Sequence, residues 1–200
     1  MTYILLDLGN VVTGVDFRRV FTHWSNSSGV PEQRFYDRWQ LDEAYEQHEI
    51  GALEFEEYAG HLSGVFEADM HLDQWRDGWN DLWTGPFQSV VNMLPVLADK
   101  YPLYAFTNTN NTHVECWSEL YSAELAPFRK IFISSELGVR KPSPSAYLHV
   151  CELMGAEPHS VLFIDDTLAN VDGALEAGLD ARHAKNEGEV AAILSPLLEC

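Results

Sequence analysis

Four short apolar runs constrain the fold of this chain more than any other feature. Each is too short for a helix and is rich in β-branched or aromatic residues, and none alternates strictly between apolar and polar positions. This pattern is typical of strands that are covered on both faces, as in a parallel sheet. The runs occupy residues 3–6, 103–106, 131–134 and 161–164.

Helix-like segments accompany the last three runs. "SVVNMLPVLADK" precedes the second run, and "SPSAYLHVCELMG" lies between the third and the fourth. The latter segment opens on a Ser-Pro start signal and ends on Gly155, a typical helix stop. "NVDGALEAG" follows the fourth run. Strands that alternate with helices predict an α/β fold with a Rossmann-like parallel sheet and right-handed crossovers.

Nearly half the chain separates the first run from the second. Residues 17–86, here called the helical insertion, contain amphipathic stretches such as "FRRVFTHWS" and "EFEEYAGHL". We expect the insertion to form a small helical domain, and residues 1–16 and 87–200 to form the core domain. Five of the six tryptophans fall in the insertion, where most should be core: Trp24, Trp39, Trp75, Trp79 and Trp83.

The charge balance argues against two classes of partner. The chain has 12 Lys and Arg against 31 Asp and Glu, for a net charge of −19. Nucleic acids and anionic lipid surfaces both require a basic footprint, which this composition does not offer. No stretch approaches the roughly 18 apolar residues that a membrane span needs. We therefore expect no nucleic-acid partner and no membrane partner. We also expect the protein to be a monomer or a weak homodimer.

Cysteine usage indicates a reducing compartment. Cys116, Cys151 and Cys200 are few, odd in number and widely spaced, and no Cys-x-x-Cys pair occurs. The first residues carry no basic segment leading into an apolar run, so no secretory signal is recognised. A cytoplasmic protein is the resulting expectation.

Polar residues follow the predicted strands at the edge where ligands bind in an open parallel sheet. Taken singly, each has an ordinary explanation as a turn former, a helix cap or a solvated loop residue. Together they would gather three acids, a hydroxyl and a lysine at one rim. The residues are Asp7 after the first run, Thr107 and Asn108 after the second, Lys141 after the third, and Asp165 and Asp166 after the fourth.

Such a rim predicts a metal site. Carboxylates that converge in a cleft repel one another unless a cation lies between them. Hard oxygen ligands at a site open to water suit Mg²⁺. A lysine at the same rim suits an anionic substrate, and a phosphate ester of a small molecule is the natural candidate.

The set "DLGNV", "FTNTN", "RKP" and "FIDDTLANVDGA" resembles the four motifs of the haloacid dehalogenase superfamily, whose members are mostly phosphatases. The motifs come from both ends of the chain, and the insertion corresponds to the helical cap of that family. "DLGNV", "EAYEQHEIG" and "RKPSPSAY" are most similar to a bacterial subgroup that dephosphorylates sugar phosphates, notably α-D-glucose 1-phosphate.

The resemblance implies roles for four of these residues in catalysis. Asp7 would be the nucleophile that becomes an aspartyl-phosphate. Thr107 and the amide of Asn108 would hold the transferring phosphoryl oxygens. Lys141 would neutralise charge between the phosphate and Asp7, which matters because two anions must approach one another.

The resemblance also implies the ligands of Mg²⁺. Asp7, the backbone carbonyl of Gly9 and Asp166 would bind the ion. Asp165 would orient the site or reach the metal through water. Asn170 lies where many relatives carry another acid. We expect it to contact the residues that bind Mg²⁺ and not the ion itself.

Gly9 departs from the family pattern, because most phosphatases of this superfamily have a second aspartate there. That aspartate protonates the leaving alcohol, and a general acid typically contributes ~10²–10⁴-fold in rate. One explanation is a substrate with a good leaving group, such as the anomeric hydroxyl of a sugar 1-phosphate, and this is our preferred hypothesis. Another is that Asp16 or His48 supplies the proton.

Two other functions remain open at the level of the sequence. Metal-independent 2-haloacid dehalogenases of the same superfamily also lack the second acid, although the pair Asp165 and Asp166 would repel their carboxylate substrates. A catalytically idle protein that binds a ligand or partner is the second alternative, and intact Asp7, Lys141 and Asp166 disfavour it.

The insertion should select the leaving group and exclude water. Its segment "LDEAYEQHEIG" offers Asp42, Tyr45 and His48 as groups able to bond sugar hydroxyls. Trp24 or Trp39 could stack on a sugar ring, although packing in the bundle core is the simpler role for both.

Overall fold

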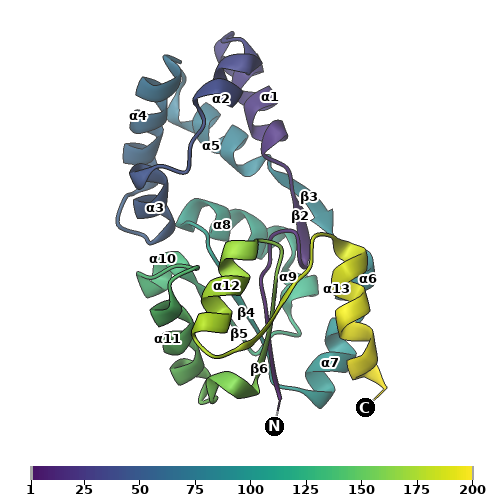
Figure 1. Ribbon diagram of the computed structural model, residues 1–200. Helices are drawn as coiled ribbons and strands as arrows, with labels where there is room; N and C mark the ends of the chain where they lie inside the picture. The colour runs from purple at the N-terminus through teal and green to yellow at the C-terminus, as the bar shows by residue number, and fades with distance from the viewer. Residues whose placement is uncertain (1, 200) are drawn as a thin grey trace.

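Five parallel strands form the central sheet in the order β5-β4-β1-β6-β7 (Figure 1). The computed structural model describes residues 2–199, and Met1 and Cys200 lie outside the described residues. The first strand is central, because it pairs with β4 on one side and with β6 on the other. The strands are β1 (Tyr3–Leu6), β4 (Leu103–Thr107), β5 (Lys130–Ile133), β6 (Val161–Asp165) and β7 (Asp180–His183).

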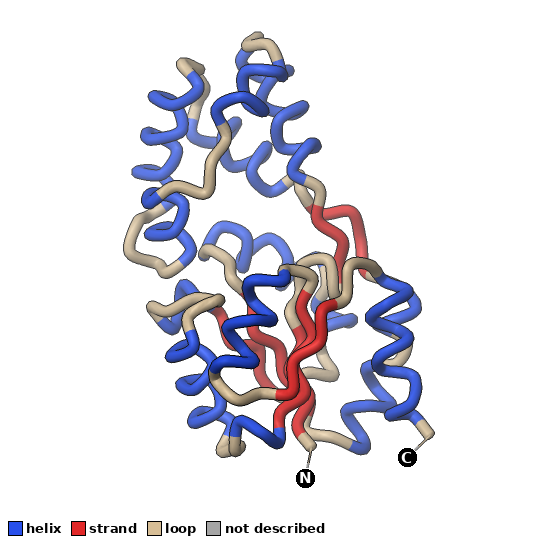
Figure 2. Tube along the Cα trace, in the orientation of Figure 1, coloured by secondary structure: helices blue, strands red, loops and turns tan. Residues whose placement is uncertain are grey.

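Helices cover both faces of the sheet (Figure 2). Side chains alternate along β1, so Ile4 and Leu6 pack on one face with α6, α7 and α13, while Leu5 packs on the other with α11 and α12. Both faces are therefore apolar, which explains why the strand sequences do not alternate. The helices are α6 (Gln88–Val91), α7 (Leu94–Lys100), α11 (Pro144–Met154), α12 (Leu168–Glu176) and α13 (Glu187–Leu194).

The α/β class with a parallel sheet is confirmed, and two details differ from the sequence prediction. The edge strand β7 was not predicted, because its sequence Asp-Ala-Arg-His is too polar to resemble a buried run. The segment 89–100 forms two helices rather than one, and Pro95 lies in the first turn of the second helix, where its missing N–H costs no hydrogen bond.

The helices of the insertion pack above the sheet around an aromatic core (Figure 1). Trp24 and Trp79 are fully buried and stack with their ring centroids 5.9 Å apart. Gly78 permits this packing, because a Cβ atom there would lie 2.3 Å from the Trp24 ring. The helices are α1 (Phe17–Ser28), α2 (Glu32–Arg38), α3 (Glu43–Glu49), α4 (Phe55–Phe66) and α5 (Leu72–Asn80).

A two-stranded antiparallel ribbon joins the insertion to the rest of the chain (Figure 2). It consists of β2 (Thr13–Val15) and β3 (Trp83–Pro86), and Thr13 lies opposite Pro86 while Val15 lies opposite Trp83. The chain thus enters and leaves the insertion side by side, directly above the carboxyl ends of the sheet strands.

Short elements complete the structure. None of the helices between residues 2 and 199 has the length and apolar character that a membrane crossing needs. Cys116 and Cys151 are free thiols, and Cys200 lies outside the described residues. The remaining elements are α8 (Asn111–Leu120), α9 (Ser122–Leu125), α10 (Ser134–Leu137), and the 3₁₀ helices η1 (Pro158–Ser160) and η2 (Ser195–Leu198).

Candidate active site

The central strand places Asp7 at the rim of the sheet, one residue beyond the end of β1. The Asp7 backbone stays tied to the sheet, because its N–H donates to the carbonyl of Ile164 on β6 at 2.9 Å. The side chain is 8% exposed, and its Oδ1 accepts a hydrogen bond from the N–H of Leu8 at 2.7 Å. A buried and fixed carboxylate at a cavity wall can act as a nucleophile.

Lys141 lies beside Asp7 and is itself only 1% exposed. Its Nζ is 2.9 Å from Asp7 Oδ1 and 2.6 Å from Asp165 Oδ2. The aromatic rings of Phe106 and Phe163 flank the ammonium group at 5.6 and 5.5 Å from their centroids. Two carboxylates and two ring faces therefore compensate the loss of solvent around this buried charge.

The backbone around Lys141 is clamped from two sides. Asn108 donates from Nδ2 to the Lys141 carbonyl and accepts from the Lys141 N–H, both at 2.9 Å. On the other side α12 approaches so closely that a Cβ atom on Gly173 would lie 2.0 Å from the carbonyl oxygen of Pro142. The side chain of Asn108 thus positions Lys141, a role that the sequence did not predict.

The two acids after β6 face different partners. Asp165 is fully buried, and it accepts hydrogen bonds from the Thr167 N–H at 2.8 Å and from Asn170 Nδ2 at 3.0 Å, in addition to its ion pair with Lys141. Asp166 is partly exposed and accepts from Asn10 Nδ2 at 3.1 Å. Asp165 therefore positions the side chains of Lys141 and Asn170. Asp166 forms no ion pair with a cationic side chain of residues 2–199, so its carboxylate can bind a metal ion.

The concentration of charge at the rim shifts several pKa values. Burial, opposed by Lys141 and reinforced by Asp165 and Asp166, raises the pKa of Asp7 to about 7. Burial and then Asp165 raise the pKa of Asp166. Burial alone would lower the pKa of Lys141, yet Asp165 and Asp7 outweigh it and raise that pKa. The lysine thus stays charged, whereas Asp7 and Asp166 lack enough positive charge nearby.

This arrangement fits a divalent cation. Oxygen atoms of Asp7, Asp165 and Asp166 all lie within 4.8 Å of one another. Both oxygens of Asp165 are already engaged, so Asp7 and Asp166 are the carboxylates with capacity for an ion. Hard carboxylate ligands in a hydrated cleft are typical of Mg²⁺ sites.

A cavity of about 410 Å³ lies over Asp7, between the rim of the sheet and the insertion. A cavity of this size can enclose a small organic molecule. Thr107, at the end of β4, is 6% exposed and lines it. The structure brings these predicted residues to its wall: Asp7, Gly9, Thr107, Asn108, Lys141, Asn170 and, from the insertion, Tyr45.

Two predicted substrate contacts of the insertion lie elsewhere. Among residues 2–199, neither Asp42 nor His48 lines the cavity. Asp42 caps α3 by accepting from the Tyr45 N–H at 2.9 Å, and its other oxygen lies 2.7 Å from His61 Nε2. His48 is 3% exposed, its Nδ1 contacts the Leu53 carbonyl at 2.8 Å, and burial lowers its pKa. Both side chains therefore stabilise the insertion itself.

The tryptophans considered for sugar stacking also pack inside the insertion. Trp24 is fully buried, and its Nε1 donates to the Trp75 carbonyl at 3.0 Å. Trp39 packs against Phe17 and Tyr45, with ring centroids 5.4 and 5.7 Å away. Within the part of the chain that the structure describes, neither ring lies on the cavity wall.

Comparison with known proteins identifies the family of this chain. The chain matches the haloacid dehalogenase-like hydrolases over residues 1–178. The chain belongs to the haloacid dehalogenase-like hydrolase family. The match covers the motifs that carry Asp7, Lys141 and Asp166 as well as the whole insertion.

Two curated relatives that align over most of this haloacid dehalogenase-like hydrolase are named as phosphatases. The D-ribitol-5-phosphate phosphatase of Bacteroides thetaiotaomicron is 21% identical over 92% of this chain and 91% of its own. A phosphatase of Mycobacterium tuberculosis is 27% identical over 93% of this chain and 88% of its own. A haloacid dehalogenase family enzyme of B. thetaiotaomicron, solved with magnesium and inorganic phosphate, is 26% identical with a TM-score of 0.78 over 92% of this chain and 94% of that one.

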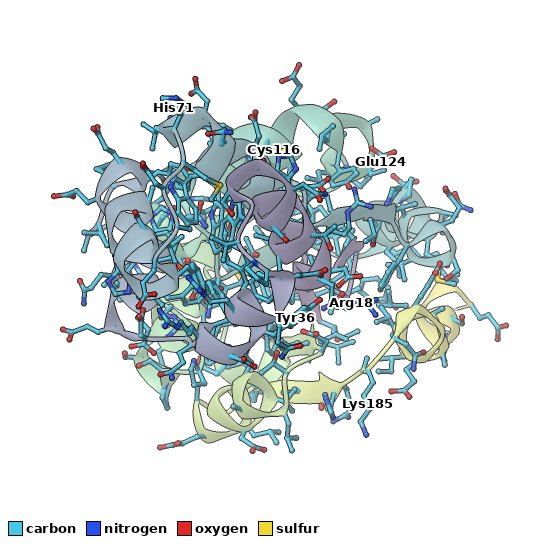
Figure 3. The ribbon with its side chains drawn as sticks, turned by 90° about the horizontal axis from the view of Figure 1, so that it is seen from above. Arg18, Tyr36, His71, Cys116, Glu124 and Lys185 are labelled. Atoms are coloured by element: carbon cyan, nitrogen blue, oxygen red, sulfur yellow. The ribbon has the colours of Figure 1, made fainter. Side chains whose placement is uncertain are left out.

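Asp16, a candidate proton donor for this haloacid dehalogenase-like hydrolase, lies outside the cavity. It caps α1 and forms an ion pair with Arg18 at 2.7 Å. Both residues line a second, open hollow together with Tyr36 on the outer side of the insertion. Figure 3, which looks down on the insertion, shows the labelled Arg18 and Tyr36 side chains close together on that side.

Asn10 is a site residue of the haloacid dehalogenase-like hydrolase that the sequence reasoning missed. Its backbone is left-handed, with φ of 55°, a conformation that Asn tolerates better than most residues. This turn lets its Nδ2 reach Asp166 at 3.1 Å while its Oδ1 accepts from the Val15 N–H at 3.1 Å. Asn10 thus links the metal-site acid to the ribbon that leads into the insertion. The sequence feature that could have identified Asn10 is its place in the motif "DLGNV".

Gly9 lines the cavity of the hydrolase, but the backbone conformation at this position does not require a glycine. Its φ is not in the left-handed region, and a Cβ atom would meet only Val15 Cγ2, at 3.4 Å. The backbone conformation and the space at this position therefore admit a Cβ atom. The missing acid is a property of the sequence that the local geometry does not impose.

Proposed function

We propose that this hydrolase is a Mg²⁺-dependent phosphatase in which Asp7 is the nucleophile. The observation that carries the proposal is the placement of Lys141 Nζ between Asp7 and Asp165, with Asp166 facing Asp7 at the same rim. A carboxylate can attack an anionic phosphate ester only where positive charge screens the repulsion, and Lys141 together with a bound divalent cation would supply that charge here.

The proposed chemistry has two steps on the same carboxylate. Asp7 Oδ attacks phosphorus, the bond from phosphorus to the leaving oxygen breaks, and the leaving oxygen takes up a proton from water to give the alcohol. Water then attacks the aspartyl-phosphate, which releases inorganic phosphate and restores Asp7. Lys141 and the N–H groups after β4, around Thr107 and Asn108, hold the phosphoryl oxygens during both steps.

Asp7, Asp166 and the backbone carbonyl of Gly9 would hold Mg²⁺. The bound ion would neutralise the phosphoryl charge and align it with the nucleophile. Asp165 holds Lys141 in place, and Asn170 in turn holds Asp165. We further propose that the insertion is a cap domain, and that the enzyme works in the cytoplasm as a monomer or weak homodimer.

We propose that the substrates are sugar phosphates, with α-D-glucose 1-phosphate as the leading candidate. The absence of an acid at Gly9 favours leaving groups that need little protonation, and an anomeric hydroxyl is such a group. A relative is named for a polyol phosphate, which supports a hydroxylated substrate of this size. The acids at the rim disfavour the dehalogenase alternative, because they would repel a 2-haloacid in the absence of a metal.

A phosphate-release screen tests the proposal. With Mg²⁺ the enzyme should hydrolyse p-nitrophenyl phosphate and sugar 1-phosphates, and EDTA should abolish both activities. Sugar 6-phosphates should be slower, because their leaving groups are more basic. Equal or faster turnover of 6-phosphates would contradict the leaving-group account, and metal-independent chloride release from 2-chloropropionate would favour a dehalogenase.

Magnesium binding should depend on pH. The metal-free pKa of Asp7 is raised from 3.8 to about 7, so from this group the folded protein loses stability as the pH rises from 3.8 to about 7. Mg²⁺ requires the charged carboxylate, and protons compete with it below that pKa. We expect the Mg²⁺-induced increase in Tm to be large at pH 8 and small at pH 5.5, measured by thermal unfolding. An increase that is equal at both pH values would contradict this pKa.

Restoring the missing acid should broaden the substrate range. Gly9→Asp places a carboxyl group at the cavity wall without a backbone penalty. We expect kcat on sugar 6-phosphates to rise on the order of 10²-fold, with a much smaller change on p-nitrophenyl phosphate, whose leaving group needs no proton. Gly9→Asn is the matched control with the same shape and no acid. Equal behaviour of the two variants would show that protonation does not limit the rate.

A further inference from the structure

Glu49, the last residue of α3, presents a buried carboxylate to the cavity that contains Asp7. It is 5% exposed, although it belongs to the insertion and not to the rim. Its Oε2 lies 2.8 Å from Nε of Arg140, the residue before Lys141. The two atoms form an ion pair without the alignment of a hydrogen bond, and neither has another hydrogen-bond partner among residues 2–199. Burial raises the pKa of Glu49, and the neighbouring Arg140 and Tyr45 side chains oppose this shift.

The position of Glu49 is fixed by contacts between the insertion and the core. Ser134 Oγ donates to the Glu49 carbonyl at 2.6 Å, and Arg140 Nη1 pairs with Glu46 at 2.7 Å. Gly51 lies against α10 so closely that a Cβ atom would be 2.3 Å from the Ser135 carbonyl oxygen. The carboxylate is thus held at a set place relative to Lys141 and the phosphate site.

The neighbouring groups restrict what this corner of the cavity can bind. Glu49 Oε2 and Arg140 Nε are paired by charge but keep hydrogen-bonding capacity that no aligned partner uses, and an apolar ligand would leave that capacity unused. A hydroxyl group satisfies both, since it can donate to Glu49 Oε2 and accept from Arg140 Nε. A carboxylate or a second phosphate would instead face the negative charge of Glu49. Tyr45, which also lines the cavity, adds another hydroxyl.

We propose that Glu49 and Arg140 form a subsite that binds a hydroxyl group of the leaving group, and so select sugar and polyol phosphates over phosphates of unhydroxylated alcohols. This inference rests on the proposed phosphatase function. It assigns substrate selection to a pair that spans the insertion and the core, in place of the predicted Asp42 and His48.

Two matched pairs of substrates test the subsite. The first pair is α-D-glucose 1-phosphate and cyclohexyl phosphate, and the second is D-ribitol 5-phosphate and n-pentyl phosphate. The wild-type enzyme should prefer the hydroxylated member of at least one pair in kcat/KM. In Glu49→Ala that preference should fall by about 10–100-fold, mainly through KM, because a hydrogen bond to a charged group is lost. Glu49→Gln keeps an acceptor and should retain part of the preference.

Controls separate this inference from the proposed function. Glu43→Ala changes an exposed residue of the same helix and should leave the preference unchanged. Hydrolysis of p-nitrophenyl phosphate with Mg²⁺ reports the phosphatase function by itself, and its absence in the wild type overturns that function. If the enzyme is active but shows no preference, or keeps it in Glu49→Ala, the subsite is overturned. If Glu49→Ala fails to fold, the wild-type preference and its partial loss in Glu49→Gln decide.

Discussion

Asp7→Asn should abolish phosphate release while the protein remains folded. The amide has the shape of the carboxylate but cannot attack phosphorus, so kcat should fall by at least about 10³-fold, as for the removal of other covalent nucleophiles. Folding should persist, because Lys141 keeps its partner Asp165 at 2.6 Å and one source of repulsion at the rim disappears. Phosphate release and thermal unfolding without metal measure the two effects.

A surface substitution provides the control for this prediction. Asp172→Asn removes the same charge from an exposed position on α12 and should change neither kcat nor Tm. Residual turnover above a few per cent in Asp7→Asn would identify another nucleophile. A variant that unfolds at room temperature would show instead that the Asp7 carboxylate stabilises the rim, contrary to its raised pKa.

Lys141→Met should impair both stability and activity. The side chain is 1% exposed, and its removal leaves the buried carboxylates of Asp7 and Asp165 without a cation. Breaking a buried ion pair by removing one partner typically costs about 3–5 kcal/mol. Urea unfolding without metal should show a loss of that order, and phosphate release should fall below detection.

The stability loss in Lys141→Met should depend on pH in a defined direction. Without the lysine, the folded-state pKa of Asp7 rises further above its value in the unfolded chain. The part of the cost that comes from Asp7 is therefore complete above this raised pKa, and it disappears as the pH falls below about 7, where the Asp7 carboxyl is already neutral in the folded wild type. A loss at pH 5 equal to that at pH 8 would contradict this electrostatic origin. Lys141→Arg should not restore activity, because a planar guanidinium does not fit between Asp7 and Asp165.

The sequence predicts the sheet well where packing is the same on both faces. Residues 3–6 are the first strand as observed, β4 and β6 each extend one residue beyond the predicted run, and β5 is shifted by one residue towards the N-terminus. The ribbon strands β2 and β3 were missed, because each is only three or four residues long and pairs with a partner about 70 positions away. Pairing over such a distance leaves no local pattern.

The rim could be predicted from the sequence because parallel strands bring their carboxyl ends together. That rule brings Asp7, Thr107 and Asp165 to one edge of the sheet. In the structure Asp7, Thr107 and Lys141 line the cavity, and Asp165 pairs with Lys141 behind it. The sequence did not show which residues of the insertion would form the wall of the cavity. Helical periodicity puts several polar residues of α3 on one side, but docking against Ser134 and Arg140 decides which of them reach the cavity.

The ribbon of β2 and β3 has a consequence for how such enzymes can diversify. Two adjacent strands carry the chain into and out of the insertion, so we expect the helical unit to be exchangeable as a block. Transplanting a foreign unit between Val15 and Trp83 would replace the wall that faces the leaving group and leave the phosphoryl-transfer chemistry intact. Arg140 would have to be exchanged with it, since it pairs with Glu46 and Glu49 of α3.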